Sequence, residues 1–311
     1  MFIKLPCKKY RLSAALAFLL LFALTPVAVY PDEASVPGSN PDTAMFWAIE
    51  KDGKPSGYLL GTIHSEDPRV LDFSTDFLHK LNSNSIFAME MVPDLPTLAR
   101  LTNYMNYPPG QTLESVIGPE RFKALTTAMS SHNIPENFVE RMKPWAAMMA
   151  LSTPPPQTGF FMDLSLSLRA SGSGLKVVGL ETLEQQLSFL EDMPLSMQLS
   201  LLDQAIAEAG RVQQAHDEMV ESYLENNLEL LVSLTDQEFD QIGEEASTYF
   251  FEAGIVQRNH RMLDSLLPHL EFATVFTAVG AMHLPGEDGL LSLLRQNGFE
   301  LMPLAMPFNA E

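Results

Sequence analysis

The sequence is nearly free of cysteine. Cys7 is the single cysteine among 311 residues, and it precedes the N-terminal apolar run, whereas a lipid-attachment cysteine would follow it. The rest of the chain therefore forms neither disulfides nor thiolate metal sites. Any metal ion in this protein must be held by imidazole and carboxylate groups.

Basic residues are also few, with 19 Lys and Arg against 39 Asp and Glu and a formal net charge of -20. The first 31 residues hold four of the cations and no acid, so their removal leaves 15 cations against 39 acids, a net charge of -24. Such acidity excludes nucleic acid as an expected partner. No D-x-D-x-D-G loop is present, so the acidity favours solubility over calcium binding.

Several familiar catalytic motifs are absent. The chain has no G-x-S-x-G, no G-x-x-x-x-G-K and no G-x-G-x-x-G after a strand, which argues against serine-triad and nucleotide chemistry. It also lacks H-E-x-x-H, so no helix carries two zinc-binding histidines one turn apart, as the common zinc peptidases do.

Residues 1–30 have the pattern of a secretion signal. Four cations precede the apolar stretch Leu12–Leu24, and the region 23–28 is a candidate for cleavage. We expect an exported protein, either periplasmic or secreted. The alternative is that the signal stays uncleaved and Leu12–Tyr30, which is barely long enough to span a bilayer, anchors the chain to a membrane.

Residues 31–43 are rich in Pro, Ser, Gly and Asp, and we expect them to be a disordered lead-in. With 46% hydrophobic residues in the sequence, residues 44–308 can bury one substantial core, so a single domain is expected. The predicted strands are 46–50, 58–60, 85–91, 175–180, 272–279 and 299–304; the predicted helices are 70–81, 119–132, 138–151 interrupted at Pro144, 161–170, 182–190, 195–234 as one long or two shorter helices, 247–267 and 289–297. These elements predict an α/β fold with a mixed β-sheet and helical cover.

Two of the predicted strands end in the same short phrase, a glycine followed three residues later by a histidine. The pairs are Gly61 with His64 and Gly280 with His283. A glycine lets the backbone leave the strand, and the histidine is then carried on a loop instead of being buried in the sheet. Because helices follow both phrases, the pattern suggests an internal two-fold repeat of strand-G-x-x-H units.

A third predicted strand ends near Glu90. The neutral imidazoles of His64 and His283, together with the Glu90 carboxylate, are the ligand types of a catalytic zinc site that keeps one position open for water. Taken singly, each histidine is an ordinary loop residue. The three together favour a shared centre, because open α/β sheets gather their sites where strands end.

Four further polar residues have ordinary structural interpretations when the chain is considered alone. Arg258 and Asn259 lie on a polar part of a predicted helix, as residues of a solvated face do. Asp163 and Glu181 fit the positions of helix caps or first-turn acids.

These motifs together resemble one known family. They are the first G-x-x-H phrase, the carboxylate that ends the next strand, the run G-L-E-T-x-x-x-Q over residues 179–186, the Arg258-Asn259 pair and the closing H-L-P-G-x-x-G-L over residues 283–290. The chain resembles the TraB/GumN family over about residues 45–306; the family also embraces the Tiki membrane-anchored proteases and the pheromone-shutdown proteins. The resemblance implies an α/β fold and relatedness to the erythromycin-esterase and ChaN-like superfamily.

The resemblance also implies roles for the residues that match its motifs. The implied centre is His64, Glu90 and His283, with Arg258 and Asn259 as polar support and Asp163 and Glu181 as carboxylates that orient a ligand histidine. We therefore expect a secreted metal-dependent peptidase whose centre holds a divalent ion such as zinc, manganese or cobalt. Its substrate would be a peptide or a small molecule, with Arg258 steadying the substrate carbonyl or the developing oxyanion.

Two alternatives keep the same residues. In a metal-free hydrolase, a histidine activates water, Glu90 assists it, and an ester or lactone is cleaved. In a non-enzymatic haem- or iron-binding or signalling module, His64 or His283 is an axial ligand. The sequence specifies neither the substrate nor the oligomeric state.

Overall fold

The computed structural model describes residues 43–309, except for the side chains of residues 238–240. The predicted signal and nearly all of the predicted lead-in lie outside the described residues. Six strands form one sheet in the order β4-β3-β5-β2-β1-β6. They are β1 (Phe46–Lys51), β2 (Lys54–Thr62), β3 (Ile86–Met89), β4 (Lys176–Gly179), β5 (Val275–Gly280) and β6 (Glu300–Pro303).

The sheet is mixed, as the sequence predicts. Strands β4, β3, β5 and β2 run parallel, whereas β1 is antiparallel to both of its neighbours, β2 and β6. The register places Thr62 beside Gly280, and Met89 beside both Ala278 and Gly179. Parallel strands end at the same edge, so the segments that follow β2, β3, β4 and β5 begin along one edge of the sheet.

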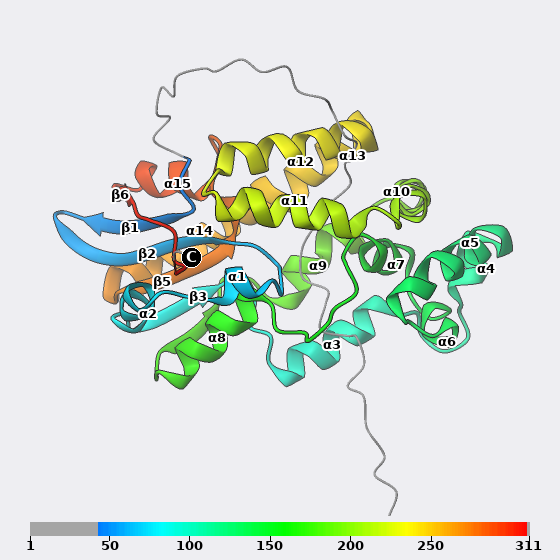
Figure 1. Ribbon diagram of the computed structural model, residues 1–311, viewed down its shortest axis with the longest axis horizontal. Coiled ribbons are helices and arrows are strands. Elements are labelled where there is room, and N and C mark those ends of the chain that lie inside the picture. The colour runs from blue at the N-terminus through cyan, green and yellow to red at the C-terminus, as the bar shows by residue number, and fades with distance from the viewer. Residues whose placement is uncertain (1–42, 310–311) are drawn as a thin grey trace, which may run out of the picture.

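Helices surround this sheet and extend to one side of it (Figure 1). They are α1 (Pro68–Leu71), α2 (Thr75–Asn82), α3 (Leu95–Met105), α4 (Leu113–Ile117), α5 (Pro119–Met129), α6 (Glu136–Val139), α7 (Pro144–Leu151), α8 (Met162–Gly172), α9 (Leu183–Glu191), α10 (Leu195–Glu208), α11 (Val212–Leu224), α12 (Leu228–Ile242), α13 (Glu244–Tyr249), α14 (Gln257–Phe272) and α15 (Leu290–Gln296). Three further helical segments are the 3₁₀ turns η1 (Ser130–His132) and η3 (Ala281–His283) and the π-helix η2 (Phe250–Val256). Within residues 43–309, no helix is both long and apolar enough to cross a membrane.

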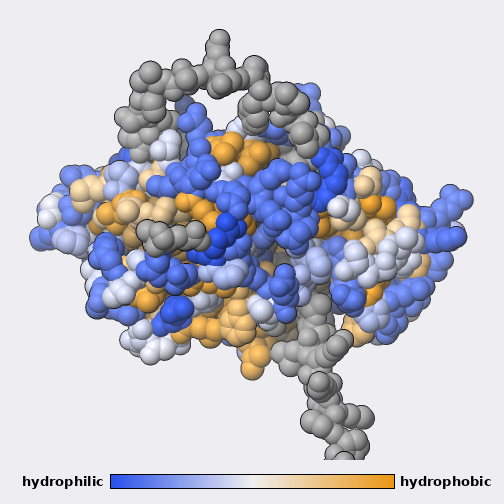
Figure 2. All heavy atoms as spheres, in the orientation of Figure 1, coloured by the Kyte–Doolittle hydropathy of each residue, from blue (hydrophilic) through white to orange (hydrophobic). Residues whose placement is uncertain are grey.

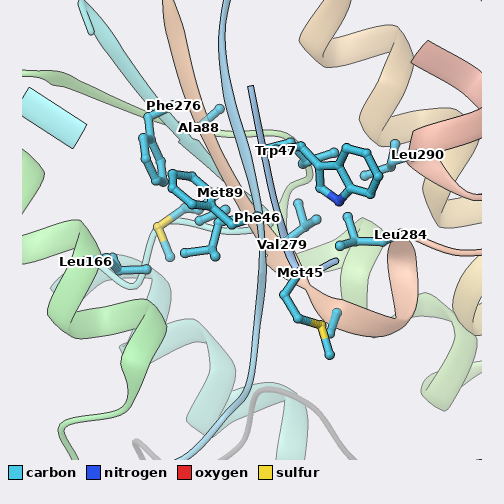
Figure 3. Close-up of a cluster of buried hydrophobic side chains, with 14 of the residues drawn as sticks. Met45, Phe46, Trp47, Ala88, Met89, Leu166, Phe276, Val279, Leu284 and Leu290 are labelled. Atoms are coloured by element: carbon cyan, nitrogen blue, oxygen red, sulfur yellow. The ribbon is translucent and has the colours of Figure 1, made fainter. Parts of the chain in front are cut away.

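The apolar side chains form two separate buried clusters. The sheet cluster joins the strands to helices such as α8 and α15. Figure 3 shows Phe46 and Leu166 on one face of the sheet and Trp47 and Leu290 on the other, as the alternation of side chains along a strand requires. The helical cluster is built mainly from α3 to α7, α9 and α10. The molecule therefore has two packed cores, and the edge of the sheet faces the boundary between them.

The loop between the first two strands is shorter than the interval between the predicted strands 46–50 and 58–60, and it makes a tight hairpin. Its turn is Asp52-Gly53, and both residues have positive φ, at 53° and 69°. This combination suits a two-residue hairpin turn, so β2 begins at Lys54. Gly57, predicted in the loop, lies inside β2 with a φ of 141°, and a Cβ there would be 1.9 Å from the carbonyl oxygen of Val275. A glycine is therefore required where β2 passes β5.

Four helical predictions are corrected in detail, the first being helix 70–81, which is divided into α1 and α2 by the non-helical residues 72–74. The segment 195–234 contains parts of three helices, because the chain breaks near Gly210 and again at Asn226, whose φ is 56°. The predicted helix 247–267 is divided among α13, the π-helix and α14. Pro144 begins α7 instead of interrupting a helix, since proline is favoured at the first helical position.

The structure does not confirm the internal repeat. After β2 the chain runs through residues 63–67 before α1, whereas after β5 it turns at once into η3. The two G-x-x-H phrases therefore leave the sheet in different conformations.

Candidate functional site

The sheet edge brings together side chains that follow four parallel strands. His64 follows β2, Glu90 follows β3 and Glu181 follows β4, while His283 ends the η3 turn after β5. Arg258 reaches this edge from the start of α14. The candidate site is therefore assembled from segments that are far apart in the sequence.

A fully buried guanidinium ties the edge together. Arg258 donates from Nη2 to Oε2 of Glu90 at 2.6 Å and to Oε2 of Glu181 at 2.7 Å, and from Nε to the same Glu181 oxygen at 2.9 Å. Arg261, one turn further along α14, lies with its Nη2 3.4 Å from Oε1 of Glu181. Two carboxylates and two guanidinium groups therefore balance one another in this part of the interior. Such pairing is what makes buried charges tolerable.

Glu90 is at the centre of this network. Its Oε2 also accepts from Nε2 of Gln186 at 2.9 Å, and its Oε1 accepts from the backbone N–H of Gly280 at 2.8 Å. Burial acts to raise the pKa of the Glu90 carboxyl, but the charge of Arg258 holds that pKa below its usual value. Glu90 is therefore ionised and already hydrogen-bonded through both oxygens.

His283 is held as a neutral imidazole. Its Nδ1 lies 2.6 Å from Oδ1 of Asn259, whose Nδ2 donates to the carbonyl oxygen of Asp288 at 2.8 Å. This orientation of the amide places the imidazole proton on Nδ1, so the lone pair is on Nε2, which faces Oε1 of Glu90 at 3.7 Å. Burial lowers the pKa of His283 to about 4, so the ring is uncharged near neutral pH.

His64 lies near Glu90, and both line the same small cavity. Its Nδ1 is 3.5 Å from Oδ2 of Asp163, and the second oxygen of Asp163 accepts from the hydroxyl of Thr62 at 2.6 Å. The ring stacks on Phe161 with centroids 3.9 Å apart. Its Nε2 is buried and has no hydrogen-bond partner among the described residues.

The predicted residues are thus brought together as two pairs. Glu90 and His283 face each other, and His64 lies with Asp163; His64 and Glu90 both line a cavity of about 50 Å³. In the described part of the chain, no three His, Cys, Asp or Glu side chains are grouped closely enough to hold one metal ion. Glu181, expected to orient a histidine, instead pairs with Arg258 and Arg261.

The two predicted glycines have distinct roles at this edge. Gly280 supplies a backbone N–H to Glu90. Gly61 permits close packing: a Cβ there would be 2.7 Å from Leu284 and 3.0 Å from the Cα of Ala281, in the turn that carries His283. The carbonyl oxygen of Gly61 also accepts from the hydroxyl of Tyr223 at 2.6 Å.

Replacing Gly61 with alanine is expected to lower the free energy of unfolding by about 1–3 kcal/mol, because the added methyl group overpacks the η3 turn. Urea denaturation measures the change. The matched control is Gly172→Ala, because a Cβ on Gly172 meets open space. Equal stability of the two variants would show that η3 can move away without cost.

Sequence reasoning missed Gln186, Thr62 and Tyr223 as residues of this site. Gln186 had a recognisable signal: it occupies a buried position between Leu183 and Leu190 on the apolar face of α9. A polar residue on such a face must find a partner inside the protein. The other two make contacts over long separations in the chain, which local patterns do not reveal.

Acid is expected to destabilise the metal-free protein between about pH 6.5 and about pH 4. An unfolded histidine titrates near pH ~6.5, whereas folded His283 titrates at about 4. In this window the unfolded state binds the extra proton, so the free energy of unfolding falls as the pH falls. Urea unfolding of chelator-treated protein at a series of pH values measures this fall, which should be shallower in His283→Gln. An identical pH dependence in that variant would assign the effect to other groups.

The fold and the site define an α/β protein whose parallel strand ends carry histidines and a buried carboxylate–guanidinium network. The chain belongs to the TraB/PrgY/gumN family, whose sequence model matches residues 45–303. The resemblance inferred from the motifs is therefore confirmed.

Curated relatives of this chain are named as metalloproteases. "Metalloprotease TIKI2" of Xenopus tropicalis is 25% identical over 340 residues, covering 91% of this chain and 65% of the relative. "Metalloprotease TIKI1" of Danio rerio is 24% identical over 310 residues, covering 83% of this chain and 62% of the relative. "Metalloprotease TIKI1" of Homo sapiens is 22% identical over 313 residues, covering 83% and 61%. The chain thus spans somewhat less than two thirds of the length of these relatives, and no solved structure matches it.

Proposed function

We propose that this protein is an exported hydrolase, and more specifically a metal-dependent peptidase, acting at the strand edge that carries His64, Glu90 and His283. The observation that supports this most strongly is shared by the two histidines. Each ring has a polar partner at Nδ1, Asn259 or Asp163. Among the described residues, Nε2 of His64 has no hydrogen-bond partner, and Nε2 of His283 faces Oε1 of Glu90 at 3.7 Å. Metal-binding histidines characteristically pass their other N–H to such a partner.

The donor types fit zinc, manganese or cobalt. Two neutral imidazole nitrogens and a carboxylate oxygen are ligands that these ions accept. Nε2 of His283 and Oε1 of Glu90 are 3.7 Å apart. These two groups would hold such an ion, and Nε2 of His64, which has no partner among the described residues, would be the third donor only after moving toward them, because no three such side chains are grouped closely enough there to share one ion. When bound, such an ion supplies a water acidified to a nucleophile near neutral pH.

The protein's own groups support this chemistry. Asn259 keeps the imidazole proton of His283 on Nδ1, and Arg258 and Gln186 keep the Glu90 carboxylate in place. Arg258 also has a buried Nη1 without a hydrogen-bond partner among the described residues, and the residue lines the cavity beside His283. We assign to this N–H donor the stabilisation of a substrate carbonyl or oxyanion.

Metal analysis of protein purified from the exported fraction tests the proposal. We expect a divalent ion in the wild type, its loss in both His64→Ala and His283→Ala, and chelator-sensitive cleavage of a peptide library. His79→Ala is the matched control, because His79 is exposed on α2. Retention of the full metal content in either site variant would reject that histidine as a ligand.

A metal-free hydrolase is the second candidate, favoured by the hydrogen bonds that already engage Glu90. Arg258, Gln186 and the Gly280 N–H hold this carboxylate against the Nε2 side of His283. In this arrangement His283 is the base that activates water. Chelator-insensitive cleavage of an ester or lactone would favour it, whereas a visible absorption band after haem titration would favour the haem-binding alternative.

Export is part of the same proposal. It is supported by the cationic and then apolar pattern of residues 1–30. Fractionation of cells expressing the full chain with a C-terminal tag tests it. Recovery of a shortened chain in the exported fraction is expected, while an unshortened chain in the membrane fraction would indicate an N-terminal anchor.

A further inference from the structure

A large cavity opens beside His283, on the side of the site that faces α9 and the π-helix. Its volume is about 460 Å³, within the range of about 300–1,000 Å³ typical of ligand pockets. His283, Arg258 and Asn259 line one end of it. Most of the remaining wall is apolar, and includes Phe189 and Phe250. Polar groups of the candidate site are therefore continuous with an apolar chamber.

The π-helix Phe250–Val256 forms part of the wall. π-Helical turns are rare in proteins, and those that occur are often found at functional sites. Gly254 lies within it and is buried, and a Cβ there would meet the ring of Phe189 at 3.5 Å, an ordinary contact distance. Because Gly254 and Phe189 both line the cavity, a larger side chain at position 254 would occupy space that the glycine leaves open.

The cavity on the His64 side has a smaller apolar share of its lining, although carboxylates line both cavities. It measures about 270 Å³, and its lining includes Glu66, Asp67, His216 and Asp217 beside His64. An apolar group of a bound molecule would lose contact with water there while facing ionisable side chains. The two sides of the site therefore differ in the chemical groups that they accept.

The apolar end of the cavity disfavours ionised side chains. Arg258 is neutralised by Glu90 and Glu181, so it offers no net charge to an acidic side chain. Three carboxylates of the lining, Asp236, Glu287 and Asp288, are exposed, so a basic side chain would pair with them only close to water and would be costly to bury against the apolar wall. A large uncharged apolar group avoids both penalties and fills the volume.

We propose that this cavity is the specificity pocket of the protein and binds a large apolar side chain, aromatic or long aliphatic, next to the bond of a peptide substrate that is cleaved. The identification of that bond rests on the proposed peptidase function. The binding of the apolar side chain does not, and it is tested separately.

Two variants that block the pocket provide the test. Gly254→Leu fills the cavity from its buried wall. Ile255→Trp adds volume from a position that is only partly buried, so this variant is expected to fold even if Gly254→Leu does not. Gly172→Leu is the control, because its added side chain begins in open space. The probes are N-acetyl-phenylalaninamide and N-acetyl-alaninamide, and saturation-transfer NMR at millimolar concentration measures their binding.

The phenylalanine probe is expected to bind the wild type and Gly172→Leu, and to bind the two blocked variants about tenfold or more weakly. In a peptide library, the preference for an aromatic or long aliphatic residue beside the cleaved bond should fall in the same two variants. Undiminished probe binding in both blocked variants, or no binding to the wild type, would overturn the pocket assignment. If only the two blocked variants lose probe binding, and neither the wild type nor any variant cleaves peptides, the pocket assignment is supported and the peptidase function is rejected.

Discussion

Replacing Arg258 with methionine is expected to lower the free energy of unfolding by about 3–5 kcal/mol, because it leaves the buried Glu90 without a guanidinium partner and Glu181 with only the more distant Arg261. The guanidinium is fully buried and bonds both Glu90 and Glu181 at 2.6 to 2.9 Å. Isothermal urea unfolding, followed by circular dichroism, measures the change.

Two comparisons separate this effect from a general loss of packing. Arg261→Met removes a partly exposed guanidinium 3.4 Å from Glu181 and should cost at most about 1 kcal/mol. Adding Glu90→Gln and Glu181→Gln to Arg258→Met should restore part of the stability, since neutral amides need no counter-charge. If Arg258→Met is as stable as Arg261→Met, the buried network does not carry the stability assigned to it.

Replacing His283 with glutamine is expected to lower kcat/KM by about 10²–10⁴-fold while leaving the fold intact. The substitution removes the lone pair on Nε2 that faces Glu90, whether that lone pair binds a metal ion or activates water directly. Asn259→Leu, which leaves the ring without its Nδ1 partner, should cost about 10–100-fold. Initial rates on the best peptide of a library screen measure both losses.

The matched control is His79→Gln, which changes an exposed histidine on α2 and should leave the rate unchanged. Thermal unfolding of each variant shows whether a loss of rate is a loss of folded protein. Activity of His283→Gln within twofold of the wild type would remove His283 from the reaction and leave His64 as the only histidine of the proposed centre.

The sheet and its functional edge could be predicted because local signals specify them. Short apolar runs ending in glycine mark β2 and β5, and the carboxylate of Glu90 follows a similar run. Three strand ends could therefore be assigned chemistry before any contact was known. The helical breaks were less predictable, because the sequence Phe250–Val256 contains no proline that would mark the change from α-helix to π-helix.

The ion network could not be predicted from local patterns. Arg258 appears on a polar stretch of a helix, and such a stretch looks the same whether it faces water or two buried acids. Its partners, Glu181 and Glu90, are 77 and 168 residues away in the chain. Glu181 likewise resembles a first-turn acid until the fold brings α14 over the end of β4. Only the tertiary arrangement decides these roles.

The position of the site between two apolar clusters has an evolutionary consequence. Strand ends from the sheet cluster supply the imidazoles and carboxylates, whereas α9 and the π-helix, which contribute to the helical cluster, supply much of the wall of the large cavity. Figure 2 shows mixed polar and apolar surface on the visible face, both over the sheet and over the helices to one side of it. In the proposed enzyme, substitutions on α9 and the π-helix would therefore change which substrates are selected without changing His64, Glu90 or His283, so that related proteins would acquire new substrates while keeping the same chemistry.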